Sequence, residues 1–320
     1  MSSRLLLRLV LLLEALLALA IGVAAARFGA GIWHAAAIGV GSVLLARLAI
    51  NANNFVMSQR VASPTPAQHQ LGVAAALRMV GEEFGASMLA SSWHMPRARA
   101  HTRIHHGSST PPVLLLHGYG CNSGYWAHLV LLFDAARISH ATLDLEPLTG
   151  DIDGFATRIE EGAAQLRRQA GAEQIVVVGH SMGGLAARAW LRSHGSAHVA
   201  RVITLGTPHH GTCLAAFGIG INARQMRRAG LAGPACAWLS ELAGHEDAAT
   251  RALITSIYTH HDNIVAPQTS GHLEGARNLE VGGVGHVALG RNRRVLSIVM
   301  SEIATLKAAH IEPAVLRNFQ

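Results

Sequence analysis

A serine flanked by glycines is the first residue in this chain that could do chemistry. The segment Gly179-His180-Ser181-Met182-Gly183 has the pattern G-x-S-x-G and directly follows an apolar, β-branched run at 175–178. Small flanking residues permit a tight strand-to-helix turn, which exposes the serine Oγ and directs the next backbone N–H groups to the same point. An unassisted hydroxyl is a weak nucleophile, so a base must take its proton. The pattern therefore predicts Ser181 as a nucleophile with a base elsewhere in the chain.

An acid and a base follow this serine in the sequence. Asp262 comes after a predicted strand at 253–258, and His286 comes after another at 278–281. Both therefore lie at carboxyl ends of strands, where α/β sheets place their sites. We expect His286 to take the Ser181 proton and return it to the leaving group, while Asp262 holds the imidazole tautomer. The rival acids, which we interpret as loop or cap residues, are Asp144, Asp151, Asp153 and Asp247. The rival bases, His260 and His261, stand beside the proposed acid and not on the next loop.

A glycine-containing loop after the first strand predicts the remaining part of the site. His117-Gly118-Tyr119-Gly120 follows the apolar run that begins at Val113. Acyl transfer builds negative charge on a carbonyl oxygen, and fixed N–H donors must lie where that charge develops. We expect the backbone N–H groups of Tyr119 and Met182 to be those donors. His117 is expected to hold the loop by hydrogen bonding and not to act as the base.

The elements that position these loops alternate between strands and helices. Helical faces occur at 155–166 and 185–191, between apolar runs at 113–117, 138–145, 175–178, 199–205, 253–258 and 278–281. Continuous apolar strands separated by helices are typical of a parallel sheet covered on both faces. The predicted class is therefore α/β, with a mostly parallel sheet and a catalytic domain over 111–310.

Four motifs together resemble the bacterial lipase and esterase branch of the α/β-hydrolases. They are His117–Gly120, Gly179–Gly184, Leu205–Thr212 and Gly285-His286, and the similarity covers about residues 113–300. The resemblance implies an α/β-hydrolase fold, carboxylester hydrolysis through an acyl-enzyme with the triad Ser181, Asp262 and His286, and a small cap at about 212–240. Larger relatives carry a calcium-binding aspartate shortly after the histidine, whereas Val-Ala-Leu-Gly stands here at 287–290. We therefore expect no metal and no cofactor.

Composition limits the partners that this chain can have. Of its 320 residues 50% are hydrophobic and 14% are charged, which excludes a disordered chain and suggests contact with lipid. The formal charge is +7, of which +3 falls in the first 50 residues. The remainder is spread too thinly for a nucleic-acid surface. We expect an acyl-ester or lipid substrate, a membrane and no nucleic acid; the sequence does not identify protein partners.

Residues 1–60 are predicted to be a membrane anchor. Two apolar runs, 5–26 and 28–50, each have the length of a bilayer-spanning helix and would form a hairpin. A secretory signal cleaved near Ala26, followed by one span, is the alternative. Four basic residues flank the outer ends of the hairpin: Arg4, Arg8, Arg47 and Arg60. The turn between the two runs has Arg27 alone. By the positive-inside rule, we expect the outer ends and the catalytic domain in the cytoplasm, at a bacterial inner membrane.

A linker, 61–110, is expected between the anchor and the catalytic domain. After Ser63-Pro64-Thr65-Pro66, apolar residues recur at helical spacing: Val73, Leu77, Val80, Phe84 and Met88. This stripe predicts an amphipathic helix packed on the core, and a membrane-surface helix is the alternative.

Two questions stay open at this level. Cys213 and Cys236 flank the cap and could form a disulfide in an oxidising compartment, although free thiols are the expectation. A thioesterase or acyltransferase could use the same triad, and a membrane-anchored binding protein without activity could keep the scaffold.

Overall fold

Seven strands form one sheet in the order β1-β3-β2-β4-β5-β6-β7. The structure is a computed structural model that describes residues 2–230 and 233–306, so 231–232 of the predicted cap and 307–310 of the predicted catalytic domain lie outside it. Every neighbouring pair is parallel except β1 with β3. The strands are β1 Thr102–Arg103, β2 Val113–Leu116, β3 His140–Leu143, β4 Ile175–His180, β5 Val199–Leu205, β6 Ile254–Thr259 and β7 Arg277–Val281. The predicted mostly parallel α/β sheet is confirmed.

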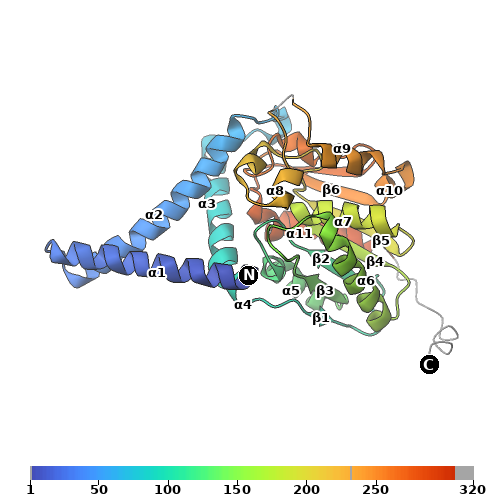
Figure 1. The fold of residues 1–320 in the computed structure, drawn as a ribbon, viewed down its shortest axis with the longest axis horizontal. Coiled ribbons are helices and arrows are strands. Elements are labelled where there is room, and N and C mark those ends of the chain that lie inside the picture. Colours follow the sequence, from blue (N-terminus) through green and yellow to red (C-terminus); the bar gives the residue numbers. More distant parts are fainter. Residues whose placement is uncertain (1, 231–232, 307–320) are drawn as a thin grey trace.

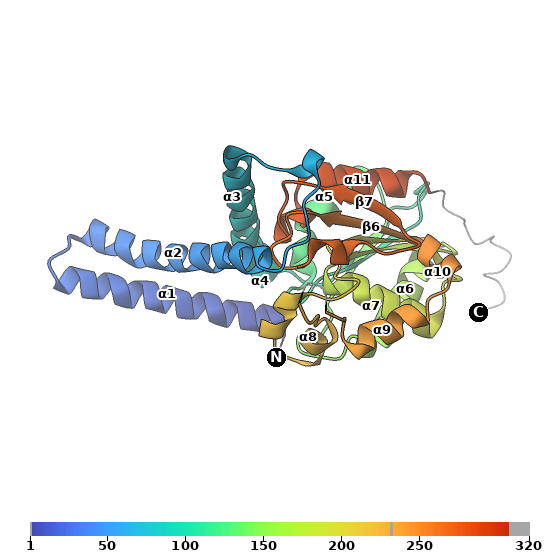
Figure 2. The same ribbon diagram turned by 90° about the horizontal axis from the view of Figure 1, so that it is seen from above.

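Helices cover both faces of this sheet (Figures 1 and 2). One face packs against α6 (Ala156–Ala170), α7 (Met182–His194) and α9 (Ala237–Gly244). The other packs against α5 (Ala127–Ala135), α11 (Arg293–Ala304) and part of α3 (Val73–Leu89). Side chains along β2 alternate between the faces: Leu114 and Leu116 join the first core, and Val113 and Leu115 the second. The central strands are continuously apolar because both faces of the sheet are buried.

Shorter helical elements complete the chain. The α-helical turns are α4 (Met95–Arg97), α8 (Ile221–Gln225) and α10 (Ala248–Ala252), and a π-helical turn is η2 (Ala90–His94). The 3₁₀ turns are η1 (Ala67–His69), η3 (Ser123–Trp126), η4 (Asp153–Phe155), η5 (Cys213–Phe217), η6 (Gln268–Gly271) and η7 (Val287–Gly290).

The order of the strands reverses at β2. The chain passes from β2 to β3 on one side and then returns to β4 on the other. At such a switch point the loops after the two central strands diverge, and ligands bind outside the carboxyl ends of the strands. His117–Gly120 follows β2, and Ser181 follows β4, so the topology brings these two predicted loops to one place.

A helical hairpin projects from the domain that contains the sheet (Figure 2). Helices α1 (Ser3–Arg27) and α2 (Ile32–Gln59) are both long and apolar enough to cross a membrane, with mean hydropathies of 2.6 and 1.7. A Cβ on Gly39 would lie 2.1 Å from the Ala18 carbonyl oxygen, so small residues let the two backbones meet. The charged interruptions are paired: the Arg47 guanidinium donates to Glu14 at 2.8 Å, and Arg8 donates to the Pro96 carbonyl at 2.9 Å.

The amphipathic helix predicted within the linker is present as α3. The prediction of which of its faces packs on the core is wrong. Val73 and Leu77, at the start of the predicted stripe, are 79% and 69% exposed. The buried residues of α3 are instead Met79, Glu83 and Ala86. A helical stripe shows only that one side is apolar, and it does not say which neighbour that side meets. Part of this stripe, Phe84 and Met88, lines a cavity of about 250 Å³ that α3 shares with the hairpin.

The edge strand β1 is absent from the predicted elements. It has two residues, both exposed, and lies in a stretch of alternating basic side chains. Only its pairing with β3 makes it a strand. A segment this short has no hydrophobic period from which it could be predicted.

Gly183→Ala should destabilise the fold. Helix α7 passes so close to β2 that a Cβ at position 183 would lie 2.2 Å from the Leu116 carbonyl oxygen. We expect a loss of roughly 1–3 kcal/mol, as for overpacked cores. Thermal unfolding of the detergent-solubilised chain measures it. Gly81→Ala is the matched control, because nothing lies within 4 Å of its added Cβ. Equal melting temperatures for the two variants would contradict the packing argument.

Candidate active site

Ser181 occupies a strained turn between β4 and α7. Its φ of 54° and ψ of −122° are unusual for a residue other than glycine. Two hydrogen bonds hold it there: its N–H donates to the Leu205 carbonyl at 2.8 Å, and the Thr207 hydroxyl donates to its carbonyl at 2.9 Å. Strain kept in place by its surroundings is a feature of functional sites.

The glycines around Ser181 are required by close contacts. A Cβ on Gly179 would lie 2.6 Å from the backbone nitrogen of Gly184, and one on Gly184 would lie 2.1 Å from the Thr207 hydroxyl. The turn therefore closes only when these positions carry no side chain. His180, the variable residue before the serine, stacks on Tyr125 with ring centroids 4.0 Å apart.

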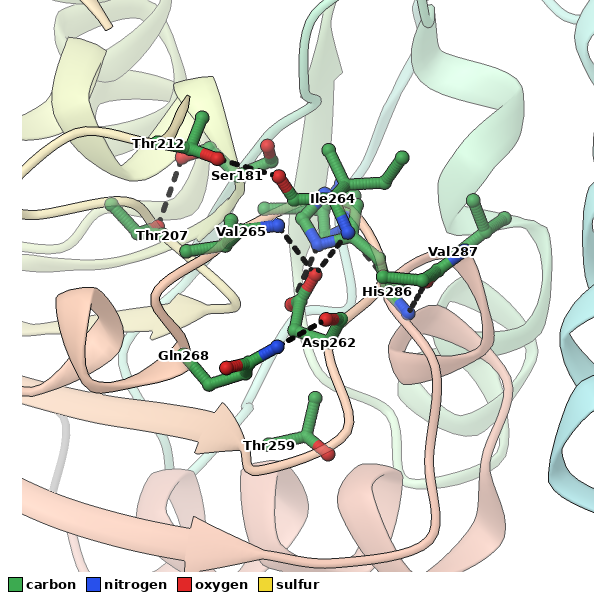
Figure 3. A network of polar contacts seen from close by, with 12 residues as sticks. Ser181, Thr207, Thr212, Thr259, Asp262, Ile264, Val265, Gln268, His286 and Val287 are labelled. Carbon is green, nitrogen blue, oxygen red and sulfur yellow. Dashed lines mark hydrogen bonds and ion pairs between the residues drawn. The ribbon is translucent and has the colours of Figure 1, made fainter. Parts of the chain in front are cut away.

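Asp262 and His286 form a buried pair (Figure 3). His286 Nδ1 lies 2.8 Å from Asp262 Oδ2, and the two side chains are 5% and 2% exposed. The other carboxylate oxygen of Asp262 accepts the N–H groups of Ile264 and Val265 at 2.8 and 2.7 Å. These bonds fix the carboxylate, so His286 Nδ1 carries the proton and its Nε2 is left as the basic nitrogen.

The structure brings this pair next to the turn of Ser181. Leu205 accepts the Ser181 N–H, and Gly206 follows it in the chain. A Cβ on Gly206 would lie 3.2 Å from both Asp262 Oδ2 and His286 Nδ1. The rings of His180 and His286 are 4.6 Å apart. Within the described residues, the Ser181 hydroxyl makes no hydrogen bond to His286. In enzymes without substrate this bond is often long and tightens only in the complex.

Burial and the neighbouring carboxylates shift the pKa of His286 in opposite directions. Burial lowers the pKa of this imidazole, whereas the charge and hydrogen bond of Asp262, together with the charge of Glu83, raise it. The net direction is upward. The opposite holds for His180, where burial and the charge of His286 take the pKa well below its ordinary value and keep the ring neutral.

The rival acids and bases are engaged elsewhere. Asp247 caps α10, and Asp144 accepts the Ser123 N–H at 2.7 Å. Asp153 pairs with Arg192 at 2.6 Å. His260 donates to Glu280 at 2.9 Å, and His261 Nδ1 accepts the Gly283 N–H at 3.0 Å. None of these contacts involves Ser181 or His286.

The two predicted N–H donors belong to different segments that lie beside Ser181. Met182 opens α7, and a Cβ on Gly118, beside Tyr119, would lie 3.0 Å from the Ser181 Cβ. Among the described residues, neither the Met182 nor the Tyr119 N–H has a hydrogen-bond acceptor. His117 holds its loop: its Nδ1 donates to the Gly118 carbonyl at 2.9 Å, and its Nε2 accepts the Leu145 N–H at 2.8 Å. Burial lowers the pKa of His117, so this ring is neutral.

A short cap contacts the residues that carry these donors. The Tyr119 hydroxyl donates to the Ile219 carbonyl at 2.8 Å and accepts the Ile219 N–H at 2.9 Å. Asn222 of α8 donates to the Met182 sulfur at 3.5 Å. Phe217 and Ile219 are 72% and 75% exposed. Helix α8, which follows them in the chain, lies on the side of the domain from which the hairpin projects (Figure 2). The cap therefore combines an anchored inner side with an apolar outer side.

Two polar side chains near the site are absent from the predicted set. Asn263 is buried and accepts the His286 N–H at 3.0 Å. Gln268 donates to the Asp262 carbonyl at 2.9 Å and accepts the N–H of Ser63, in the linker, at 3.0 Å. Asn263 stands directly beside the predicted acid in the sequence, a signal that could have identified it. Gln268 has no such signal, because its role depends on a contact 205 residues away.

Other reactive side chains lie away from the serine or have partners. Cys121, Cys213 and Cys236 are free thiols, and burial raises the pKa of Cys121 to about 12. Within the part of the chain that the structure describes, two clusters bring metal-ligating atoms within 4.8 Å of one another: His69, His260 and Glu280, and His105, Asp134 and His140. In both clusters the carboxylate already pairs with an imidazole, at 2.9 and 3.2 Å.

Comparisons with known proteins point to one fold. A family model described as a PGAP1-like alpha/beta domain matches residues 159–223, which include Ser181. A lipase of Bacillus licheniformis in its mature form is 20% identical, with a TM-score of 0.53 over 64% of this chain and 97% of that chain. Lipase B of Aspergillus fumigatus is 17% identical, with a TM-score of 0.55 over 77% of this chain and 61% of that chain. At these identities the likeness shows the shared fold.

Asp262→Asn should change both the turnover and its pH dependence. Losing the carboxylate removes the group that raises the His286 pKa, so the acid limb of kcat/KM should move to lower pH. Loss of the correct tautomer should lower kcat by about 10⁴. A pH–rate profile with an activated ester measures both effects. Asp247→Asn is the control, because asparagine also caps helices. A profile like that of the control would rule out this role for Asp262.

Proposed function

We propose that this chain, which has the α/β-hydrolase fold, is a serine hydrolase of carboxylic esters. The observation that carries the proposal is the buried contact of 2.8 Å between His286 Nδ1 and Asp262 Oδ2, next to the strained turn of Ser181. A buried imidazole held by a carboxylate beside a serine at a strand–helix turn is the arrangement that nucleophilic catalysis needs. The lipases that share the fold support an ester substrate.

The proposed reaction has two halves. His286 Nε2 takes the Ser181 proton while Oγ attacks the ester carbonyl, and the oxyanion accepts hydrogen bonds from the Met182 and Tyr119 N–H groups. His286 then protonates the leaving alcohol, and an acyl-enzyme on Ser181 remains. Water, deprotonated by His286, attacks this acyl group and releases the acid. Asp262 stays ionised and stabilises the imidazolium in both halves.

We infer that the substrate is a partly apolar acyl ester taken from a membrane. The cap residues Phe217, Ile219 and Ile221 are exposed and would meet lipid, because α8, which starts at Ile221, lies on the side of the domain from which the hairpin projects (Figure 2). Tyr119 links this cap to the predicted oxyanion loop. Movement of the cap toward lipid would therefore act on the site directly.

We propose that the hairpin anchors the domain and that the domain is cytoplasmic. The backbone N–H and hydroxyl of Ser3, at the start of α1, contact Glu146 of the catalytic domain, and Ser63, after α2, contacts Gln268. Both outer ends of the hairpin therefore lie on the side of the catalytic domain. Arg4, Arg8, Arg47 and Arg60 near these ends favour the cytoplasmic side.

Ser181→Ala should abolish ester hydrolysis and leave the fold intact. The triad as a unit contributes on the order of 10⁶ to turnover, and the substitution removes one oxygen atom. A chain-length series of p-nitrophenyl esters and phospholipids measures the activity, and a serine-directed phosphonate should label only the wild type. Ser193→Ala, farther along α7, is the control. Activity within tenfold of wild type would remove Ser181 from the mechanism.

Alkaline phosphatase fusions should locate the domain. This enzyme is active only where its disulfides form, outside the cytoplasm. We expect a fusion after Gln59 to be inactive and one at Gly29, in the turn of the hairpin, to be active. Equal expression by immunoblot is the control. An active fusion after Gln59 would place the catalytic domain on the far side.

A further inference from the structure

Glu83 is a buried carboxylate outside the catalytic domain. It lies on α3, has no exposed surface, and reaches the loop that follows His286. Its Oε1 accepts the Val287 N–H at 2.9 Å, and its Oε2 accepts the Ala288 N–H at 2.8 Å. Both oxygens are thus used on the two residues that directly follow the proposed base.

These two hydrogen bonds replace the N-cap side-chain bond that η7 lacks. His286 stands at the N-cap position of η7, where a side chain normally accepts the free N–H groups of the first turn. Its own side chain cannot do so, because the imidazole is turned to Asp262. The Glu83 carboxylate supplies the acceptor from another helix. The negative charge also suits the positive end of the turn.

Gly285, the residue before His286, leaves room for this contact because it has no side chain. A Cβ on Gly285 would lie 2.6 Å from Glu83 Oε2 and 2.7 Å from its carboxyl carbon. Any other residue at position 285 would push the carboxylate away from the turn. Glu83 therefore touches the chain on both sides of His286, at one residue before it and at two after it.

The charge of Glu83 also acts on His286. The titratable groups around this imidazole are Asp262, Glu83 from α3, His180 from the end of β4, and Tyr125 from η3. Burial keeps His180 and Tyr125 neutral by lowering the pKa of the first and raising that of the second. Burial raises the pKa of Glu83 itself, against the two backbone hydrogen bonds and the charge of His286. When ionised, Glu83 is the second carboxylate that favours the imidazolium.

We infer that Glu83 is a positioning residue for His286, so that a helix outside the catalytic domain completes the active site. This inference rests on the proposed function. Helix α3 in turn meets the hairpin, because Arg47 donates to Ser91 and Ser92, just beyond its end, at 3.1 and 3.0 Å. The membrane segment and the catalytic base are thereby joined through one helix.

Glu83→Gln in the full-length chain tests the inference. The isosteric amide leaves one backbone N–H without an acceptor and removes the charge. A misplaced base costs up to about 100-fold in rate, so we expect kcat per phosphonate-labelled site to fall roughly 10- to 100-fold with KM little changed. Loss of a negative neighbour lowers the His286 pKa, so the acid limb of kcat should move to lower pH. Glu82→Gln, exposed on the same helix, is the matched control and should behave as wild type.

Gly285→Ala gives a second, independent test. It displaces the carboxylate but keeps its charge, so kcat should fall while the downward shift of the acid limb is smaller than in Glu83→Gln. In a Glu83→Ala background the added methyl group meets no carboxylate, and the second substitution should cost little. A double-mutant cycle on kcat therefore gives strong non-additivity. Additive effects would overturn the inferred contact.

The outcomes separate this inference from the proposed function. If the wild type neither hydrolyses esters nor takes the phosphonate, the proposed function fails. If the wild type is active and Glu83→Gln matches Glu82→Gln per labelled site, only the role of Glu83 fails. A loss explained entirely by fewer labelled sites, with an unchanged acid limb, would show that Glu83 only stabilises the fold and would also overturn the inference.

Discussion

Helix α7 runs so close to strand β2 that only a hydrogen atom fits between their backbones at Gly183. This contact fixes where the helix begins and hence the turn in which Ser181 takes its positive φ. It also brings the start of α7 beside the loop after β2, where the two proposed N–H donors lie. Gly183 is required by this packing, and Gly179 and Gly184 are required by further close contacts around the turn of Ser181, the proposed nucleophile.

The charge of the site is concentrated on very few groups. Buried histidines surround Ser181, yet burial and hydrogen bonding keep His117 and His180 neutral. Their ring nitrogens form hydrogen bonds with backbone groups. His180 Nε2 donates to the His286 carbonyl at 3.2 Å, and His117 Nδ1 donates to the Gly118 carbonyl. Of the three, His286 is the one whose pKa is raised, because Asp262 and Glu83 favour its protonated form.

The sequence predicts the parts of this structure that are governed by local pattern. Six strands are apolar runs between turn residues, and Ser181, Asp262 and His286 stand in loops that directly follow such runs. Contacts between distant segments have no local pattern. Val73 and Leu77 have the spacing of a core stripe but are exposed, whereas Glu83, whose sequence surroundings are those of an ordinary charged helix residue, is fully buried. A burial that depends on Val287 and Ala288 could not be predicted from the residues around Glu83.

The contact between Glu83 and the segment after His286 has a consequence for biosynthesis. Its partners lie 204 and 205 residues further along, beyond every strand of the sheet. A growing chain therefore completes the turn of Ser181 long before the loop of His286 exists, and contacts of such large sequence separation form late. In the proposed mechanism, a nascent protein in the membrane would hold a serine without its base. It would be inert toward the lipids around it until its last elements had folded.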